Sequence, residues 1–206
     1  LLAPRGEFSP GALAIKSVKK QTFLKAVKLF GLYRDIQWHA STPSEKTDIL
    51  RQFSSADGKI HVAEDPVCLD FSASTSERHP PSQSGHLRLA FISRISPMKN
   101  LDGLLRILAI TTCRTQLDIF GPVEDLAYWE TCKRLIAELP PNASVSYKSE
   151  LEADKVSSTF ADYDLFALPS HGENFGHVIF EALRAGTPVL TSDQTSWHTD
   201  PNGALT

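Results

Sequence analysis

Two short apolar runs, joined by a polar loop and an amphipathic helix, constrain the fold of this chain more than any other feature. Residues 164–190 read DLFALPSHGENFGHVIFEALRAGTPVL. The first run stops at Pro169, because proline has no N–H to give to a sheet ladder. The second run follows a Gly-Thr-Pro turn, and glycine is typical of the end of a helix. The stretch therefore predicts a strand, a loop, a helix and a second strand.

The predicted helix of this stretch has two different faces. Its apolar residues recur at the spacing of a stripe that packs on a core: Val178, Ile179, Ala182 and Leu183. Three polar residues follow the i, i+4, i+7 rule on the other side: His177, Glu181 and Arg184. We therefore expect the helix to direct Glu181 toward the loop that holds Glu173.

Glu173 and Glu181 lie eight residues apart, one on the loop and one on the helix. Two carboxylates so placed could bind the hydroxyls of a polyhydroxylated ligand, and the helix N-terminus could hold an anion. Alternatively, Glu173 is a solvated loop residue and Glu181 a surface helix residue, because exposed glutamate is common. Local spacing leaves both interpretations open.

From Leu87 onward, apolar runs alternate with helical segments. We predict strands at 87–93, 116–120 and 145–147 before the stretch above, and helices that end near Ile110, Leu139 and Phe160. Strands that alternate with helices indicate βαβ units on a parallel sheet. The predicted fold class is therefore α/β, with a Rossmann-like parallel sheet and flanking helices. Ligands of such sheets bind at the carboxyl ends of the strands.

Residues 64–86 contain few regular signals and are rich in serine and proline, which is typical of an interdomain linker or a mobile loop. We place one domain at 1–63 and another at 87–206. In the first, Thr42-Pro43-Ser44-Glu45 fits a capping box, in which Thr42 caps a helix and Glu45 reaches back to its start. This helix should end near Phe53, between strands at 36–40 and 59–63.

A basic segment precedes that region. Ser9-Pro10 predicts the start of a helix that runs to Phe30 and stops at Gly31. Its lysines form one long surface: Lys16, Lys19, Lys20, Lys25 and Lys28. This surface is either a solvated helix face or a contact for an anionic membrane or a phosphate-bearing acceptor. Because residues after 60 are net acidic, the chain does not have the charge of a general nucleic-acid binder.

Composition places the chain among soluble globular proteins. No run approaches the ~18 apolar residues of a membrane span, and the first residues lack both Met and the layout of a signal peptide. Three cysteines without a C-x-x-C pair suit a reducing compartment. We expect a cytoplasmic protein, with the inner face of the membrane as a further location, and a chain that is part of something longer.

Arg94 and Lys99 lie five residues apart at the carboxyl end of the first strand of the predicted sheet. A guanidinium with fixed geometry and a mobile ammonium together suit a diphosphate. The alternative is a pair of surface cations, since charged residues are mostly exposed.

Two motifs resemble those of one enzyme family. The pattern PS-x-x-E-x-FG...EAL-x-x-G-x-PV, within 168–190, and R-x-x-x-x-K, within FISRISPMKN, resemble the donor site of the group 1, or family 4, glycosyltransferases with the GT-B fold. The segment WHAS...E...DI resembles the end of the N-terminal domain of that group. The resemblance implies that the chain holds the end of the acceptor-side domain and most of the C-terminal donor domain.

The resemblance also implies an activity and a set of roles. The family transfers a glycosyl group, here of the hexosyl class, from a nucleotide-diphosphate sugar to a carbohydrate or lipid-linked acceptor, with retention at the anomeric carbon and with no metal or cofactor. Bacterial polysaccharide or lipopolysaccharide biosynthesis is the expected setting. Carried over, Arg94 and Lys99 bind the diphosphate, Glu181 the ribose and Glu173, the catalytic candidate, a donor-sugar hydroxyl. The remaining assignments are the backbone N–H groups of Asn174, Phe175 and Gly176, and Gly121, which lets the ligand approach the backbone.

The chain departs from the family pattern in three places. Lys148-Ser149 stands where the family usually has a glycine, so contacts to the base stay open. Ser196-Trp197-His198 differs from the usual Pro-Trp followed by an acidic residue. The closing helices and most of the N-terminal domain, with its acceptor site and catalytic histidine, are absent. We therefore expect this chain alone to bind donor weakly and to transfer nothing.

Other interpretations remain. Asp162-Tyr163-Asp164 is a D-x-D, the metal and nucleotide-sugar signature of the GT-A glycosyltransferases. A dinucleotide oxidoreductase would need a G-x-G-x-x-G motif directly after a strand, and no predicted strand is followed by one. A sugar-nucleotide 2-epimerase shares the GT-B architecture, and a non-catalytic nucleotide-sugar-binding module is a further option. The histidines have no spacing typical of zinc ligands.

Overall fold

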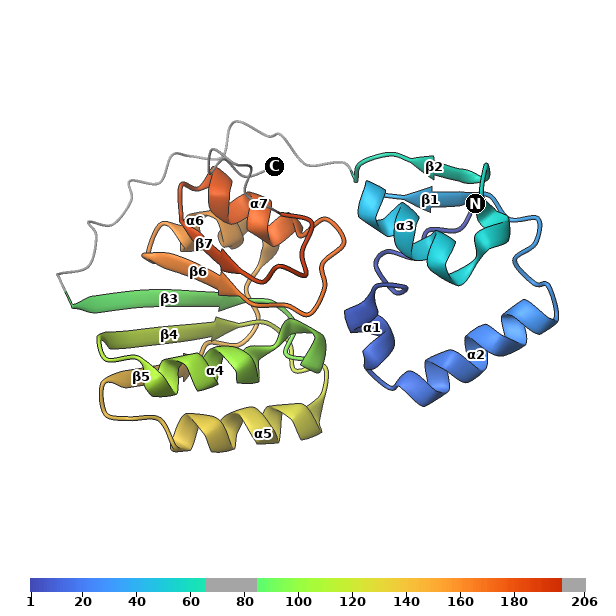
Figure 1. Cartoon of the computed structure of the whole chain (residues 1–206). Coiled ribbons are helices and arrows are strands. Elements are labelled where there is room, and N and C mark those ends of the chain that lie inside the picture. Colours follow the sequence, from blue (N-terminus) through green and yellow to red (C-terminus); the bar gives the residue numbers. More distant parts are fainter. Residues whose placement is uncertain (66–84, 198–206) are drawn as a thin grey trace. The chain divides into compact units, whose positions relative to one another are not determined.

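The computed structural model describes residues 1–65 and 85–197. The predicted linker at 64–86 therefore lies almost wholly outside the described residues. The described residues form two compact units (Figure 1). Unit 1 contains 1–65, 171–176 and 193–197, and unit 2 contains 85–170 and 177–192. The loop at 171–176 thus groups with the N-terminal residues, which the sequence pattern did not predict.

Unit 2 is an α/β domain. Its sheet contains β3 (His86–Ile92), β4 (Arg114–Phe120), β5 (Ala143–Tyr147), β6 (Leu165–Leu168) and β7 (Val189–Thr191). Its α-helices are α4 (Leu101–Ile110), α5 (Leu126–Ala137), α6 (Val156–Phe160) and α7 (His177–Arg184), with short 3-10 turns η2 (Pro97–Lys99) and η3 (Ala153–Lys155). All strand pairs are parallel, in the order β5-β4-β3-β6-β7. The predicted Rossmann-like parallel sheet with flanking helices is confirmed.

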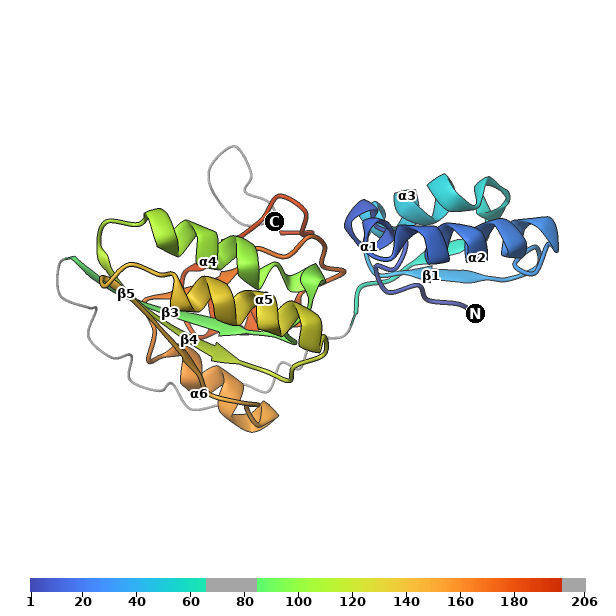
Figure 2. The same ribbon diagram turned by 90° about the horizontal axis from the view of Figure 1, so that it is seen from below.

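Helices cover both faces of this sheet. Figure 2 shows α4 and α5 on one face and α6 on the other. Helix α4 buries leucines at the spacing of a single stripe: Leu101, Leu104, Leu105 and Leu108. On α6, the ring of Phe160 packs edge-on against Phe166 of β6, with centroids 5.1 Å apart. Because the central strands are covered on both faces, their sequences are almost continuously apolar.

A bidentate ion pair joins β3 to the residue before β6. Asp164 accepts from the backbone N–H of Arg88 at 2.7 Å and from its guanidinium at 3.1 Å, and its own N–H donates to the carbonyl of Arg88 at 2.9 Å. The next residues continue the pairing in register, Leu89 with Leu165 and Ala90 with Phe166. Asp164 therefore holds the two central strands together.

This pairing argues against the D-x-D interpretation. The carboxylate of Asp164 is engaged with Arg88, and the hydroxyl of Tyr163 donates to buried Asp118 at 2.9 Å. Burial, followed by this hydrogen bond, raises the pKa of Tyr163 above its ordinary value. Within residues 1–65 and 85–197, no three His, Cys, Asp or Glu side chains are grouped so that they could hold a metal ion. Asp164 is a structural residue of the sheet.

Unit 1 contains a small parallel sheet with an aromatic core. Its elements are α1 (Pro10–Ala14), α2 (Ser17–Leu29), β1 (Trp38–Ala40), α3 (Pro43–Gln52), the 3-10 turn η1 (Ser54–Ala56) and β2 (Ile60–Val62). β1 pairs with β2. The ring of Trp38 stacks on Phe53 with centroids 5.3 Å apart, and Phe8 and Tyr33 pack on both rings. This cluster is the core of the unit.

The helix predicted from Ser9 to Phe30 is in fact two helices. Ile15 is extended and Lys16 has a φ of 53°, so the chain turns between α1 and α2. The Nζ of Lys20 donates to the carbonyl of Ala12 at 2.8 Å, across this turn. Both Ala12 and Leu24 are buried. The break falls at Ile15 and Lys16, where the sequence has neither glycine nor proline to predict it.

Of the two hydrogen bonds of the predicted capping box, the structure has the one accepted by Thr42 but not the one from Glu45 back to the start of the helix. Thr42 accepts from the N–H of Glu45 at 3.1 Å, and Pro43 begins α3, as predicted. The carboxylate of Glu45 instead accepts from Ser41 N–H and from Gly6 N–H, both at 2.8 Å. It ties the chain near the N-terminus to α3. None of the helices in the described residues has the length and apolarity that crossing a bilayer requires.

We predict that Asp164→Asn destabilises unit 2 by about 1.5–3 kcal/mol, because hydrogen bonds to a charged group contribute about that much. Urea denaturation measures the change. Asp154→Asn, at an exposed position in η3, is the matched control and should change the free energy of unfolding by less than about 0.5 kcal/mol. Equal effects of the two substitutions would contradict the role given to Asp164.

Candidate functional site

The strand order of unit 2 defines one switch point, where the order in which the chain adds strands to the sheet reverses. β3 lies between β4 and β6, and the connections from these two central strands lead to opposite edges of the sheet. In open parallel sheets, ligands bind outside the carboxyl ends of the strands at such a switch point. The loops that follow β3 and β6 are therefore the candidate site of unit 2.

These two loops contact each other through side chains. The Nδ2 of Asn100 donates to the carbonyl of Pro169 at 2.9 Å, and the hydroxyl of Ser170 donates to the carbonyl of Met98 at 3.0 Å. Lys99 lies between the two residues of the β3 loop that make these contacts. The two loops are thus joined on either side of Lys99, and these contacts fix the position of its backbone.

Gly103 makes room for this arrangement. Asn100 has a φ of 55°, a left-handed conformation that asparagine tolerates better than most residues. A Cβ on Gly103 would lie 2.4 Å from the Oδ1 of Asn100. The sequence analysis named neither residue, although the glycine in the first turn of α4 was a signal that could have been used.

Arg94 lies in the β3 loop, where it pairs with Glu124 of the β4 loop. The NH1 atom lies 2.8 Å from Oε1, and the side chains are 59% and 47% exposed. The backbones are also joined, because Ile95 donates to Pro122 at 2.8 Å and accepts from Glu124 at 3.2 Å. The sequence analysis did not identify Glu124 as a neighbour of Arg94.

Gly121, at the end of β4, has a packing reason to be glycine. Its φ is 131°, and a Cβ there would lie 2.0 Å from the carbonyl oxygen of Ser93. Its N–H donates to the carbonyl of Ser149 at 2.9 Å, and its carbonyl accepts from the hydroxyl of Tyr147 at 3.0 Å. Gly121 therefore locks the ends of three strands together, beside Arg94.

Ser149 shows why a glycine would suit the end of β5. Its φ is 67°, in the left-handed region that costs a residue with a side chain some free energy. The chain keeps the backbone conformation that glycine favours while carrying a serine there.

Glu181 lies in the middle of α7 and is half-buried. Burial raises the pKa of its carboxyl above the ordinary value of 4.5, and His177 and Arg184 partly oppose this by stabilising the charge. His177 and Arg184 are exposed and Ile179 and Ala182 are buried, as predicted, whereas Val178 and Leu183 of the predicted apolar stripe are only partly buried. A carboxylate with little solvent around it is a good acceptor for ligand hydroxyl groups.

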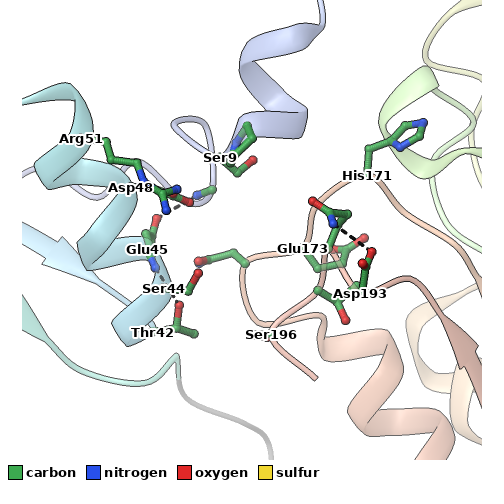
Figure 3. Close-up of a pocket in the computed structure, with 15 residues that line it drawn as sticks. Ser9, Thr42, Ser44, Glu45, Asp48, Arg51, His171, Glu173, Asp193 and Ser196 are labelled. Carbon is green, nitrogen blue, oxygen red and sulfur yellow. Dashed lines mark hydrogen bonds and ion pairs between the residues drawn. The ribbon is translucent and has the colours of Figure 1, made fainter. Parts of the chain in front are cut away.

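The loop at 171–176 contributes to a cavity in unit 1 (Figure 3). The figure shows Glu45 and Asp48 on α3 at one side of the cavity and Glu173 and Asp193 at the other. The Nδ2 of Asn174 donates to the hydroxyl of Ser41 at 2.7 Å. The loop is therefore anchored to the segment that starts α3.

The carbonyl of Phe175 is held by residues that follow β7. The indole N–H of Trp197 donates to it at 2.6 Å, and the hydroxyl of Ser196 donates at 3.3 Å. The two rings of Phe175 and Trp197 also meet edge-on at 5.7 Å. Gly176 then turns the chain into α7 with a φ of 77°. The segment that departs from the family pattern thus supports the loop that matches it.

The eight predicted site residues fall into two groups. Arg94, Lys99, Gly121 and Glu181 belong to unit 2, and Gly121 and Arg94 are neighbours there. Glu173, Asn174, Phe175 and Gly176 belong to unit 1. Their roles in binding stay a prediction.

Several curated proteins that share one name are similar to this chain. The chain is 26% identical over 164 residues to the D-inositol 3-phosphate glycosyltransferase of Arthrobacter sp., which covers 74% of the chain and 38% of the relative. It is 30% identical over 168 residues to the protein of the same name from Streptomyces avermitilis, covering 74% and 36%. The chain thus spans well under half the length of these relatives.

Solved structures share the fold. Anabaena HepE, in complex with UDP and glucose, matches with a TM-score of 0.71 at 20% identity, over 94% of this chain and 52% of that one. The lipopolysaccharide outer core galactosyltransferase WaaB, in its apo form, matches with a TM-score of 0.59 at 26% identity, over 80% and 44%. The first likeness is one of fold alone.

The family match is carried by the sequence itself. Residues 74–200, more than half of the chain, match the family described as glycosyl transferases group 1. This range contains both motifs, the switch point and all eight predicted site residues. The chain therefore belongs to the group 1 glycosyl transferases.

Proposed function

We propose that this chain carries the donor-binding part of an enzyme that transfers a glycosyl group from a nucleotide-diphosphate sugar to an acceptor. The observation that carries the proposal is the switch point of unit 2, where Lys99 is fixed by the contacts of Met98 and Asn100 and where Arg94 follows the same strand. Cations at that place suit a diphosphate, which gains negative charge as the sugar leaves.

Each predicted residue has a defined task in this proposal. Arg94 and Lys99 neutralise the diphosphate, and the first N–H groups of α7 add positive potential. Glu181 accepts hydrogen bonds from the ribose hydroxyls. Glu173 holds a hydroxyl of the donor sugar, and the N–H groups of residues 174–176 bind the sugar and the phosphate. Transfer proceeds with retention and without a metal, as the family resemblance implies.

The nucleotide is proposed to be UDP. Anabaena HepE was solved with UDP and glucose and with UDP-glucose, and it shares the fold of this chain. The resemblance of the motifs to the family supports a role in bacterial polysaccharide or lipopolysaccharide synthesis, and we place this role in the cytoplasm or at the inner face of the membrane as part of the proposal. The exposed lysines of α2 would then contact anionic lipid.

We predict that the chain binds UDP and that Arg94→Ala and Glu181→Ala each weaken binding roughly tenfold or more, as expected for lost charge-assisted hydrogen bonds. Titration calorimetry with UDP, GDP and ADP measures affinity and base preference. Arg114→Ala, at the amino end of β4, and Glu138→Ala, after α5, are matched controls that should leave the affinity unchanged. If the folded chain bound none of the three at millimolar concentration, the donor-site assignment would be wrong.

The ion pair with Glu124 should weaken UDP binding, because Glu124 competes with the diphosphate for Arg94. We predict that Glu124→Gln tightens UDP binding about two- to fivefold, since an exposed pair contributes up to about 1 kcal/mol. Glu130→Gln is the control: it removes the same charge from an exposed pair with Lys133 on α5. If both variants bound UDP more tightly to the same degree, the cause would be the general change in charge and not the release of Arg94 from Glu124.

The raised pKa of Glu181 gives a pH signature. As the pH falls, Glu181 becomes protonated at a higher pH than an ordinary glutamate, whose pKa is 4.5, and it then accepts one hydrogen bond fewer from the ribose. At neutral pH the native chain should therefore bind UDP more tightly than Glu181→Gln does. As the solution is acidified, this difference in affinity should begin to shrink at a pH above 4.5. Calorimetry on both proteins across the mildly acidic range measures this difference, which also cancels the titration of UDP itself.

Acidification should have the opposite effect on the free energy of unfolding, to which Glu181 should contribute more favourably as the pH falls. Because folding raises the pKa of Glu181, its ionised form is disfavoured in the folded state at neutral pH, and protonation relieves this cost. Glu181→Gln should therefore be at least as stable as the native chain at pH 7. A clear loss of stability in that variant would contradict the assignment of Glu181 as a ligand-binding group.

A further inference from the structure

The cavity of unit 1 has a volume of about 220 Å³, and most of the residues that line it carry polar side chains. All of its lining residues belong to unit 1: Gly6, Ser9, Pro10, Thr42, Ser44, Glu45, Asp48, Arg51, His171, Glu173, Asn174, Asp193, Gln194, Thr195 and Ser196. Five of these residues carry hydroxyl groups and four carry carboxylates. No large apolar side chain is among them, so the cavity does not suit a lipid chain or an aromatic ligand.

The acidic side of this cavity is built into the fold. Glu45 is 5% exposed and accepts two backbone N–H groups, so its charge is held in place. Asp48 is 8% exposed, and burial raises its pKa, although Arg51 opposes this rise. These carboxylates are fixed features of α3 and not solvated side chains.

Among the residues that line the cavity, Arg51 and His171 are basic, and the charge of Arg51 is paired within the lining. The NH1 atom of Arg51 lies 2.8 Å from the Oδ1 of Asp48. Glu173 and Asp193 add two more carboxylates on the other side of the cavity (Figure 3). A phosphate group in this space would meet a surplus of negative charge. Sugar hydroxyls, in contrast, can donate to carboxylates and accept from Ser and Thr hydroxyls.

We propose that this cavity binds the acceptor and that the part it recognises is an unphosphorylated sugar ring. The inference rests on the proposed function, in which Glu173 holds the donor sugar, because the same residue lines the cavity. Its volume is below the ~300–1,000 Å³ of pockets for drug-sized ligands, which suits one ring. Part of the acceptor site thus lies in this chain, although the resemblance alone placed that site outside it.

The proposal separates this chain from its relatives. The relatives from Arthrobacter and Streptomyces are named for an acceptor that carries a phosphate, D-inositol 3-phosphate. Recognition of a phosphate normally uses arginine or lysine in bidentate or multiple contacts. The cavity is lined by Arg51, which is paired with Asp48, by His171 and by three further carboxylates. Its acceptor therefore differs from theirs in charge.

The test uses the whole chain with saturating UDP and pairs of probes that differ by one phosphate. The pairs are glucose, galactose, mannose and N-acetylglucosamine with their 6-phosphates, and myo-inositol with D-inositol 3-phosphate. Saturation-transfer NMR at millimolar sugar gives relative affinities. We expect at least one neutral sugar to bind and its phosphate to bind at least tenfold more weakly.

Substitutions locate the binding. Ser44→Ala should weaken the neutral sugar about two- to tenfold, as expected for one lost hydrogen bond. Asp193→Asn should reduce the difference in affinity between the neutral sugar and its phosphate, because it removes one negative charge from the lining. Asp57→Asn, an exposed carboxylate of unit 1 outside the lining, is the matched control and should change neither value.

Each outcome decides the proposal. A phosphorylated sugar that binds as well as its neutral partner, or binding that Ser44→Ala and Asp193→Asn leave unchanged, would overturn it. If UDP binds and no sugar of the set does, the acceptor assignment is wrong while the proposed donor function stands. If UDP itself does not bind to the folded chain, the proposed function fails first.

Discussion

The pairing of β3 with β6 is the constraint on which the α/β unit depends. These two strands share a short register, and Asp164 extends it by binding the backbone and the guanidinium of Arg88. A parallel sheet can present two adjacent loops at one edge only if its central strands leave in opposite directions. The position of Lys99, and of the first turn of α7, follows from that pairing. Asp164, one of two acidic residues that resemble a metal motif in the sequence, here joins the two strands.

Much of the fold could be predicted because its signals are local. The alternation of apolar runs with helical segments predicted the parallel sheet, Thr42 predicted the start of α3, and periodicity predicted which side of α7 is buried. Partners across the chain could not be predicted in the same way. Spacing does not encode that Glu45 binds Gly6, or that Asp164 lies opposite Arg88. These contacts depend on the packing of elements that are distant in sequence.

The candidate site divides along the same line. Arg94, Lys99 and the two glutamates were singled out because their motifs resemble those of the family, and their roles stay a prediction. Glu124 and Asn100 were missed, since each acts through a neighbour from another loop. Gly121 was identified for ligand approach, and the structure adds a second reason, the close contact with Ser93. Ser149 shows the reverse case, in which a changed residue retains the backbone conformation that the missing glycine would favour.

The contact between Gly103 and Asn100 has a consequence for how this family can vary. The side-chain amide of Asn100 occupies the space that a Cβ at position 103 would fill, and the same amide fixes the loop after β3 to the loop after β6. A larger residue at 103 would therefore push the side-chain amide of Asn100 away from its hydrogen bond with the carbonyl of Pro169. A substitution in the first turn of α4 would thus loosen the contact between the two loops through one amide group.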